Sequence, residues 1–158
     1  MNFLTEHGIS SYGELESKLT AVSARRDTAH AEIKRIESRS AELALVMKHA
    51  GTYRQLKPLY ERYRKSNDKE KFLRGHESEI ILFEAAAREL KRLGTVPLPT
   101  TESMKTELAN LNAEKERLLA EYKAARTEAQ EYDTVKQNVD ALLTVPKEQE
   151  QQRRHELE

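Results

Sequence analysis

The chain has 158 residues, of which 34% are charged and only 37% hydrophobic, and its formal net charge is zero. This length suits about one domain, and so few apolar residues are typical of long paired helices. With no cysteine, a disulfide scaffold, a cysteine-based zinc site and a thiol nucleophile are excluded. No run approaches the roughly 18 apolar residues of a membrane span, and no signal-peptide pattern opens the chain. We therefore expect a cytoplasmic all-α protein without membrane contact.

Residues 1–10 and 11–50 make up the first part of the chain. The opening MNFLTEHGIS is typical of the end of a preceding helix, which indicates a piece of a longer protein. Ser10 and Ser11 are good N-cap residues for a long helix over 11–50. Its apolar positions recur with spacings of four and three: Leu15, Leu19, Val22, Ala29, Ile33, Ile36, Leu43, Met47 and Ala50.

Residues 51–94 form an insert that differs from both flanks. Between Lys48 and Gly75, nine Lys or Arg residues stand against three acids, a local excess of six positive charges. We call residues 48–75 the basic segment. Four aromatic residues are interspersed in it: Tyr53, Tyr60, Tyr63 and Phe72. Charge separated in this way points to an anionic partner.

The insert is expected to contain two short helices. The first covers Thr52–Lys65 and is bent or started by Pro58, which lacks a backbone donor, and Ser66–Asp68 break it. A turn over Lys69–Arg74 leads into the second helix, Glu77–Leu93, which Gly94 ends. The core side of that second helix is predicted to contain Ile80, Ile81, Phe83, Ala86, Ala87 and Leu90.

A second long helix is expected over 101–144, entered through Thr100 and Thr101 and ended by Pro146. Its apolar residues again follow the four–three spacing: Met104, Leu108, Leu111, Leu118, Tyr122, Ala125, Ala129, Tyr132, Val139 and Leu143. The remaining residues 145–158 are predicted to form a flexible polar tail.

Two long heptad helices joined by a compact insert predict an antiparallel coiled-coil hairpin with two shorter helices at its tip. Residues 11–144 then form one helical coiled-coil domain. The expected register places Val22 opposite Tyr132 and Ala29 opposite Ala125. Small residues facing each other let the helices approach closely at this level.

Four stretches resemble the C-terminal helical region of relaxase/mobilisation nucleases, the DNA-nicking proteins of conjugative and mobilisable elements. They are HGISSYGELESKL, HAGTYRQLKPLYERYRKS, KFLRGHESEIILFEAAARELKRLG and KTELANLNAEKERLLAEYKAARTEAQEYDTVKQNVDALL, and together they span about residues 1–144. Pro58 departs from the helix former expected at its position. The resemblance implies an accessory domain of a bacterial DNA-transfer protein. The family's nuclease chemistry lies in an N-terminal domain absent from this sequence, so no catalytic residue is assigned.

Catalytic, metal and cofactor sites find no support in the residue spacing. The five histidines form no H-x-H, H-x-x-H or H-x-x-x-H pair, and the glycines form no phosphate-binding loop. His76 beside Glu77 is best interpreted as a capping or surface residue. We expect no enzyme activity, no metal and no cofactor.

Two interpretations of the basic segment remain open. In the first, its cations bind the phosphates of single-stranded or duplex DNA, and its tyrosines stack on unpaired bases. The DNA-contact candidates are Arg54, Lys57, Arg62, Arg64, Lys65, Lys69, Lys71 and Arg74. In the second, the rings belong to the core at the hairpin tip, as their three–four spacing favours, and the cations only face water. A different class of function, a coiled-coil module for docking another transfer protein or for homodimerisation, also fits the pattern.

Overall fold

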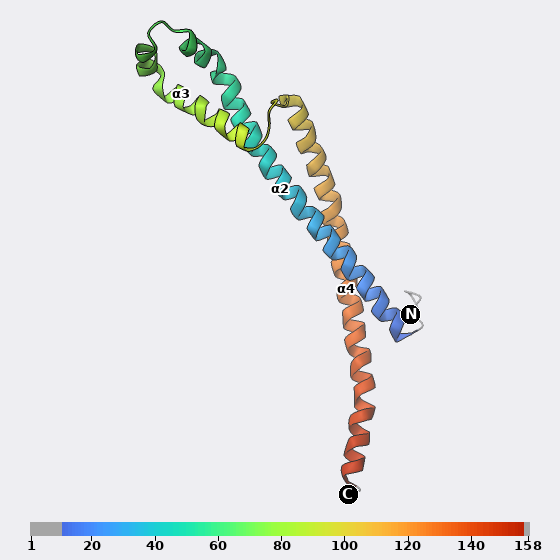
Figure 1. Cartoon of the computed structure of the whole chain (residues 1–158). Helices are drawn as coiled ribbons and strands as arrows, with labels where there is room; N and C mark the ends of the chain where they lie inside the picture. Colours follow the sequence, from blue (N-terminus) through green and yellow to red (C-terminus); the bar gives the residue numbers. More distant parts are fainter. Residues whose placement is uncertain (1–10, 157–158) are drawn as a thin grey trace. The chain divides into compact units, whose positions relative to one another are not determined.

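The computed structural model describes the backbone of residues 11–156 and the side chains of residues 11–143. This part of the chain contains three α-helices and no strand: α2 (Tyr12–Lys65), α3 (Lys69–Arg92) and α4 (Thr101–Glu156) (Figure 1). The all-α class predicted from the sequence is confirmed. The expected end of a preceding helix over 1–10 lies outside the described residues.

The helices contribute to two compact units. The first unit combines the start of α2, up to Lys34, with α4 from Lys115 onward. The second unit runs from Arg35 to Glu114 and contains the rest of α2, all of α3 and the start of α4. Each unit has buried residues of its own, and we describe the two in turn.

The first unit is held by a cluster of buried side chains from both helices: Leu15, Val22, Ala125, Ala129 and Tyr132. Val22 of α2 and Tyr132 of α4 therefore belong to the same cluster. Leu143, which the heptad pattern placed in the same seam, is instead 58% exposed. It lies on α4 beyond Asp140, whose partner Tyr12 is the first residue of α2, so no residue of α2 is left to cover it.

Polar contacts in the first unit follow the same pairing of α2 with α4. The Tyr12 hydroxyl donates to Asp140 Oδ1 at 2.5 Å, which raises the pKa of Tyr12 to about 12. Arg25 reaches Glu128 at 3.7 Å, and Lys136 reaches Glu16 at 4.0 Å. As the residue numbers increase along α2, the residue numbers of the partners on α4 decrease.

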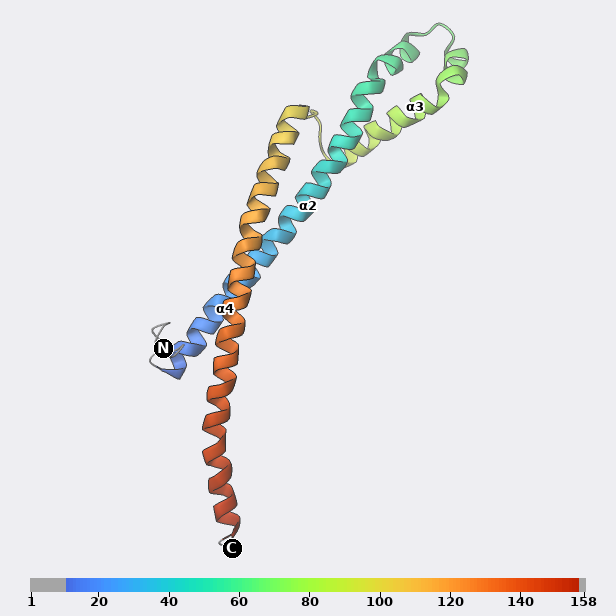
Figure 2. The ribbon, with the colours of Figure 1, turned by 180° about the vertical axis from the view of Figure 1, so that it is seen from behind.

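The second unit buries residues from all three helices: Ile36, Leu43, Val46, Ala50, Ile80, Phe83, Ala86, Leu90, Met104 and Leu111. Helix α3 lies beside the last turns of α2 in both views (Figures 1 and 2). Arg39 holds Glu107 through two hydrogen bonds, from Nε at 2.7 Å and from Nη2 at 3.1 Å. These bonds lower the pKa of the Glu107 carboxyl from its usual value.

Helix α2 does not end at Ala50, so the separate short helix expected over Thr52–Lys65 is wrong. The residues form one helix of 54 residues that continues through Pro58. A proline inside a helix removes one hydrogen bond and crowds the preceding turn, at about 3 kcal/mol. Here Tyr53 and Tyr60, on either side of Pro58, both stack on Phe83 of α3. This packing opposes the break that the proline favours.

The turn between α2 and α3 lies where the sequence predicted it, at residues 66–68. Asp68 is the N-cap of α3, since its carboxylate accepts from the backbone N–H of Lys71 at 3.1 Å. Residues 69–74 are helical, so the turn expected over Lys69–Arg74 is wrong. The irregularity falls instead at His76, whose φ of −137° and ψ of 25° interrupt the helical geometry.

After the kink at His76, α3 buries a narrow stripe of side chains. Ile80, Phe83, Ala86 and Leu90 are buried as predicted, but Ile81 is 53% exposed and Ala87 only half-buried. The buried positions are spaced by three and four residues, which gives a stripe narrower than the one expected from composition.

Helix α3 ends at Arg92 with Leu93 as its C-cap, and Gly94 follows as the C′ residue, as predicted. Gly94 has φ of +70°, and its N–H donates to the carbonyl of Lys91 while the N–H of Thr95 donates to that of Leu90. This pair of bonds is a Schellman motif, which glycine favours because it has no Cβ. Thr100 caps α4 through a bond from the N–H of Ser103 to its hydroxyl at 3.1 Å.

Helix α4 continues to Glu156, so Pro146 does not end it and the backbone of residues 145–156 is helical. The residues after Pro146 are mainly Glu, Gln and Arg, which have high helix propensity. Among the described residues, no helix is long and apolar enough to cross a membrane.

Candidate nucleic-acid interface

The aromatic residues of the basic segment pack as one row between α2 and α3. Phe83 stacks on Tyr53 and Tyr60, with ring centroids 4.8 Å and 4.3 Å away. Tyr63 lies 5.9 Å from Tyr60 and 6.1 Å from Phe72. Phe83 is buried and the other four rings are half-buried. The rings therefore belong in part to the core, as one of the two interpretations expected, yet part of their surface faces solvent.

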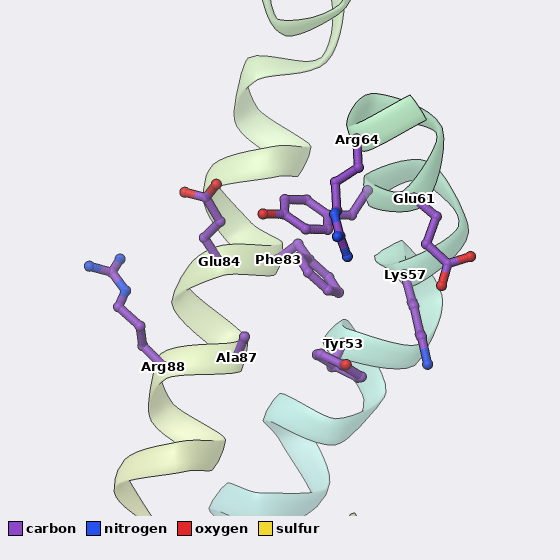
Figure 3. A pocket seen from close by; sticks show the side chains of 9 residues that line it. Tyr53, Lys57, Glu61, Arg64, Phe83, Glu84, Ala87 and Arg88 are labelled. Atoms are coloured by element: carbon purple, nitrogen blue, oxygen red, sulfur yellow. The ribbon is translucent and has the colours of Figure 1, made fainter. Parts of the chain in front are cut away.

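A groove of about 490 Å³ opens beside this row of rings. Its lining combines rings with charged side chains of both helices: Tyr53, Lys57, Tyr60, Glu61, Arg64, Phe83, Glu84, Ala87 and Arg88. We call it the aromatic groove. In Figure 3 the Arg64 side chain reaches from α2 toward the Phe83 ring, whereas Glu84 and Arg88 point outward from α3. The groove thus has an aromatic wall, and the cations beside it, Lys57 and Arg64, come from α2.

A second hollow, of about 500 Å³, lies nearer the turn and is lined by Pro58, Glu61, Arg62, Lys65, Ser66 and Phe72. The Arg62 guanidinium lies 5.7 Å from the centre of the Phe72 ring. This distance is within reach of a cation–π contact, which orients the guanidinium at the rim of the hollow. Two more of the predicted cations, Arg62 and Lys65, are therefore brought together here.

The remaining four candidate cations line neither of these two hollows. Lys69, Lys71 and Arg74 are exposed on the first turns of α3. Arg54 differs from the other seven because its guanidinium donates to the Thr101 hydroxyl at 2.8 Å and to the carbonyl of Pro99. Arg54 holds the loop before α4 in place and is the least suited of the eight to bind a partner.

All eight candidate cations are exposed, and within the described residues none forms an ion pair with a carboxylate. Of the three acids in the segment, Asp68 is already engaged as the N-cap of α3. The excess of positive charge is therefore not neutralised by nearby acids. Such uncompensated charge creates a positive potential that attracts anions and fades with added salt.

Sequence reasoning missed two features of this surface. Phe83 was assigned to the core without its role as the ring between two tyrosines, and Arg88 was not a candidate at all. Arg88 lies five residues beyond Phe83, which is about 140° around the axis of α3, so a helical plot does not place it on the same face as Phe83. What the plot cannot supply is the pairing of α3 with α2.

The side chains of this surface are suited to binding. No group of three or more His, Asp or Glu side chains among the described residues is placed to hold a metal ion. His76, the histidine singled out from the sequence, has its Nδ1 3.2 Å from Glu79 Oε2 and its ring 4.6 Å from Phe72. Both contacts fit a residue that stabilises the kink in α3.

Comparisons of this chain with protein-family models, with curated proteins and with solved structures gave no match.

Proposed function

We propose that this chain is a non-catalytic helical domain that binds nucleic acid through the exposed cations of the basic segment. The observation that carries the proposal is the set of eight exposed Lys and Arg side chains with no carboxylate partner among the described residues. Phosphates neutralised by such side chains release their counterions, which supplies affinity without sequence preference. The adjoining aromatic groove adds surfaces on which bases stack.

The biological setting of the proposal comes from the sequence resemblance. An accessory domain of a relaxase would position DNA, or partner proteins, for an active site located elsewhere in the protein. The resemblance alone supports this setting, and the charge and aromatic arguments for nucleic-acid binding do not depend on it.

The test of this proposal reverses the charge of three neighbouring candidate cations at the end of α2. In the variant Arg62→Glu/Arg64→Glu/Lys65→Glu, three phosphate contacts are lost and replaced by repulsion. At about 1–1.5 kcal/mol for each charge-assisted contact, the affinity for a labelled DNA strand should fall by at least about 100-fold. Fluorescence anisotropy at low salt measures the affinity, and circular dichroism checks that helicity is unchanged.

A matched control reverses three exposed cations of the first unit, Lys34→Glu/Lys123→Glu/Arg126→Glu. It changes the net charge by the same amount but leaves the basic segment intact. We expect it to lower the affinity several-fold at most, through the weakened long-range field. Equal losses in the two variants would reduce the proposal to an effect of net charge alone.

We further propose that α2 and α4 pair as an antiparallel coiled coil within each unit. This arrangement is supported by the contacts of the first unit, in which the partner's residue number on α4 decreases from Tyr12–Asp140 to Arg25–Glu128. Cysteines at Arg25 and Glu128 should be joined efficiently by a short bismaleimide, since the chain has no other thiol. Cysteines at Arg25 and Glu116, displaced by about 18 Å along α4, should not.

A second candidate function, docking or dimerisation through apolar surface, is favoured by a specific observation on α3. Ile81 and Leu82 are adjacent and are 53% and 55% exposed. If this pair docks a partner or a second copy, Ile81→Glu/Leu82→Glu should abolish the association while nucleic-acid affinity persists. Sedimentation equilibrium of both forms at several concentrations would detect the loss of a dimer.

A further inference from the structure

We propose that the aromatic groove is a binding site for an unpaired base of a single-stranded nucleic acid. This inference rests on the proposed function, but it assigns a ligand to one particular hollow. Electrostatic binding alone would need only the cations. The groove adds the half-buried rings of Tyr53 and Tyr60, which have no part in binding a phosphate.

The composition of the groove matches the two parts of a nucleotide. The half-buried rings of Tyr53 and Tyr60 provide aromatic surface for a planar base, while Phe83 is buried and supports both rings from below. Stacking on such surface tolerates any base because every base has a π-face. Lys57 and Arg64 of α2 provide cations for the phosphates on either side of that base, whereas Glu84 and Arg88 of α3 point outward (Figure 3). A volume of about 490 Å³ falls within the range of small-ligand sites, about 300–1,000 Å³.

Arg64 links the two parts of the site. Its side chain reaches toward the Phe83 ring in Figure 3, and its guanidinium is planar. A planar guanidinium stacks on a base as readily as it binds a phosphate. A base lying between Arg64 and the tyrosine rings would therefore be held on both faces.

The geometry favours single strands over duplex. Bases of a duplex are stacked and paired in its interior, and bringing one into a protein pocket costs a few kcal/mol. An unpaired base enters without that cost. The groove therefore adds affinity for a single strand, whereas a duplex meets only the cations of the basic segment.

The first test needs no variant. We would compare three labelled ligands on the full chain by fluorescence anisotropy: a single strand, an abasic strand with the same number of phosphates, and a duplex. Stacking of one base predicts that the base-bearing strand binds about 5- to 100-fold more tightly than the abasic strand. Equal affinities for these two strands would overturn the inference about the groove.

A variant then locates the effect. Ala87 lines the groove and is half-buried, so Ala87→Phe fills the space while every charge is kept. We expect this variant to lose most of the advantage of the base-bearing strand and to bind the abasic strand and the duplex as before. The matched control Ala87→Ser leaves the groove open and should keep the advantage.

The outcomes separate this inference from the function on which it rests. If all three ligands bind with salt dependence but without any advantage for bases, the groove inference fails and the proposed function stands. If no ligand binds, both fail. If a poly-aspartate peptide of the same charge competes as well as the base-bearing strand, the groove does not recognise bases and the inference is overturned.

Discussion

Two cations of the first unit form ion pairs between helices, whereas the cations of the basic segment form none among the described side chains. In the first unit, Arg25 and Lys136 face carboxylates of the neighbouring helix at 3.7 Å and 4.0 Å. In the basic segment, Arg62, Arg64 and Lys65 face solvent, and no carboxylate of the described side chains lies within ion-pair distance of them. Both regions belong to long helices rich in charge.

What differs between the two regions is whether charge is compensated inside the molecule. Exposed ion pairs contribute at most about 1 kcal/mol to stability, but they leave little field to attract a partner. Cations without a carboxylate partner gain no ion-pair stabilisation and instead raise the local concentration of anions. The net charge, which is zero for this chain, therefore conceals the property on which binding depends.

The largest expected effect is a loss of stability in the first unit. Tyr132 is 2% exposed and lies in the cluster that joins α2 to α4. Tyr132→Ala should lower the free energy of unfolding by about 3–5 kcal/mol, the range for removing a buried aromatic side chain. Urea unfolding followed by circular dichroism measures the loss.

The same variant also tests whether nucleic-acid binding depends on the first unit. At a temperature where Tyr132→Ala is still folded, its affinity for a DNA strand should match that of the parent chain. A large loss of affinity would show that binding depends on the first unit as well, and not on the basic segment alone.

A pair of glycine variants tests the local geometry with effects of about 1 kcal/mol. Gly94 has φ of +70°, a conformation that costs other residues about 1 kcal/mol or more, so Gly94→Ala should destabilise the end of α3. Gly51 lies inside α2, and a Cβ there would meet nothing within 4 Å. Gly51→Ala should therefore stabilise the chain by about 0.5–1 kcal/mol. Thermal unfolding of both variants checks that the two changes in stability have opposite signs. Changes of the same sign would contradict the structure.

The smallest effect concerns the pH dependence of the first unit. The Tyr12 hydroxyl donates to Asp140, and the pKa of Tyr12 is raised to about 12 from 10.0. A group whose pKa is raised in the folded state contributes stability that is complete below its unfolded pKa and is lost as pH rises through the folded one. The contribution should thus be constant up to about pH 10 and disappear toward pH 12.

Tyr12→Phe is the matched variant for this prediction. Its stability should lie slightly below that of the parent chain at pH 8 and converge with it near pH 12. A difference that stayed constant over this interval would show that the hydrogen bond to Asp140 does not set the pKa.

Periodicity predicted the parts of the fold that depend on one helix at a time. The buried state of Leu15, Val22 and Ala125 follows from the heptad pattern, because that pattern places them on a single stripe. The break at residues 66–68 and the stop at Gly94 follow from local backbone chemistry.

The features that sequence reasoning missed depend on contacts between helices. Pro58 was expected to bend or start a separate helix, but α2 continues through it, and Tyr53 and Tyr60 pack on Phe83 on either side of it. The aromatic groove required the pairing of α2 with α3, which no spacing within either helix specifies. Ile81 was assigned to the core because it is apolar and adjacent to Ile80, but only the stripe of Ile80, Phe83, Ala86 and Leu90 is covered and Ile81 is 53% exposed.

If the uncompensated cations of the basic segment bind phosphates, the affinity must depend on salt, and this dependence is the measurement to make first. We would follow the affinity of the full chain for a labelled single strand by fluorescence anisotropy from low to physiological salt. We expect a linear fall of log affinity with log salt, with a slope of about −0.7 for each phosphate bound. For Arg62→Glu/Arg64→Glu/Lys65→Glu, the slope should be smaller by about 2, because three phosphate contacts are lost. Absence of binding at low salt, or a slope unchanged by the charge reversal, would contradict phosphate binding by these cations.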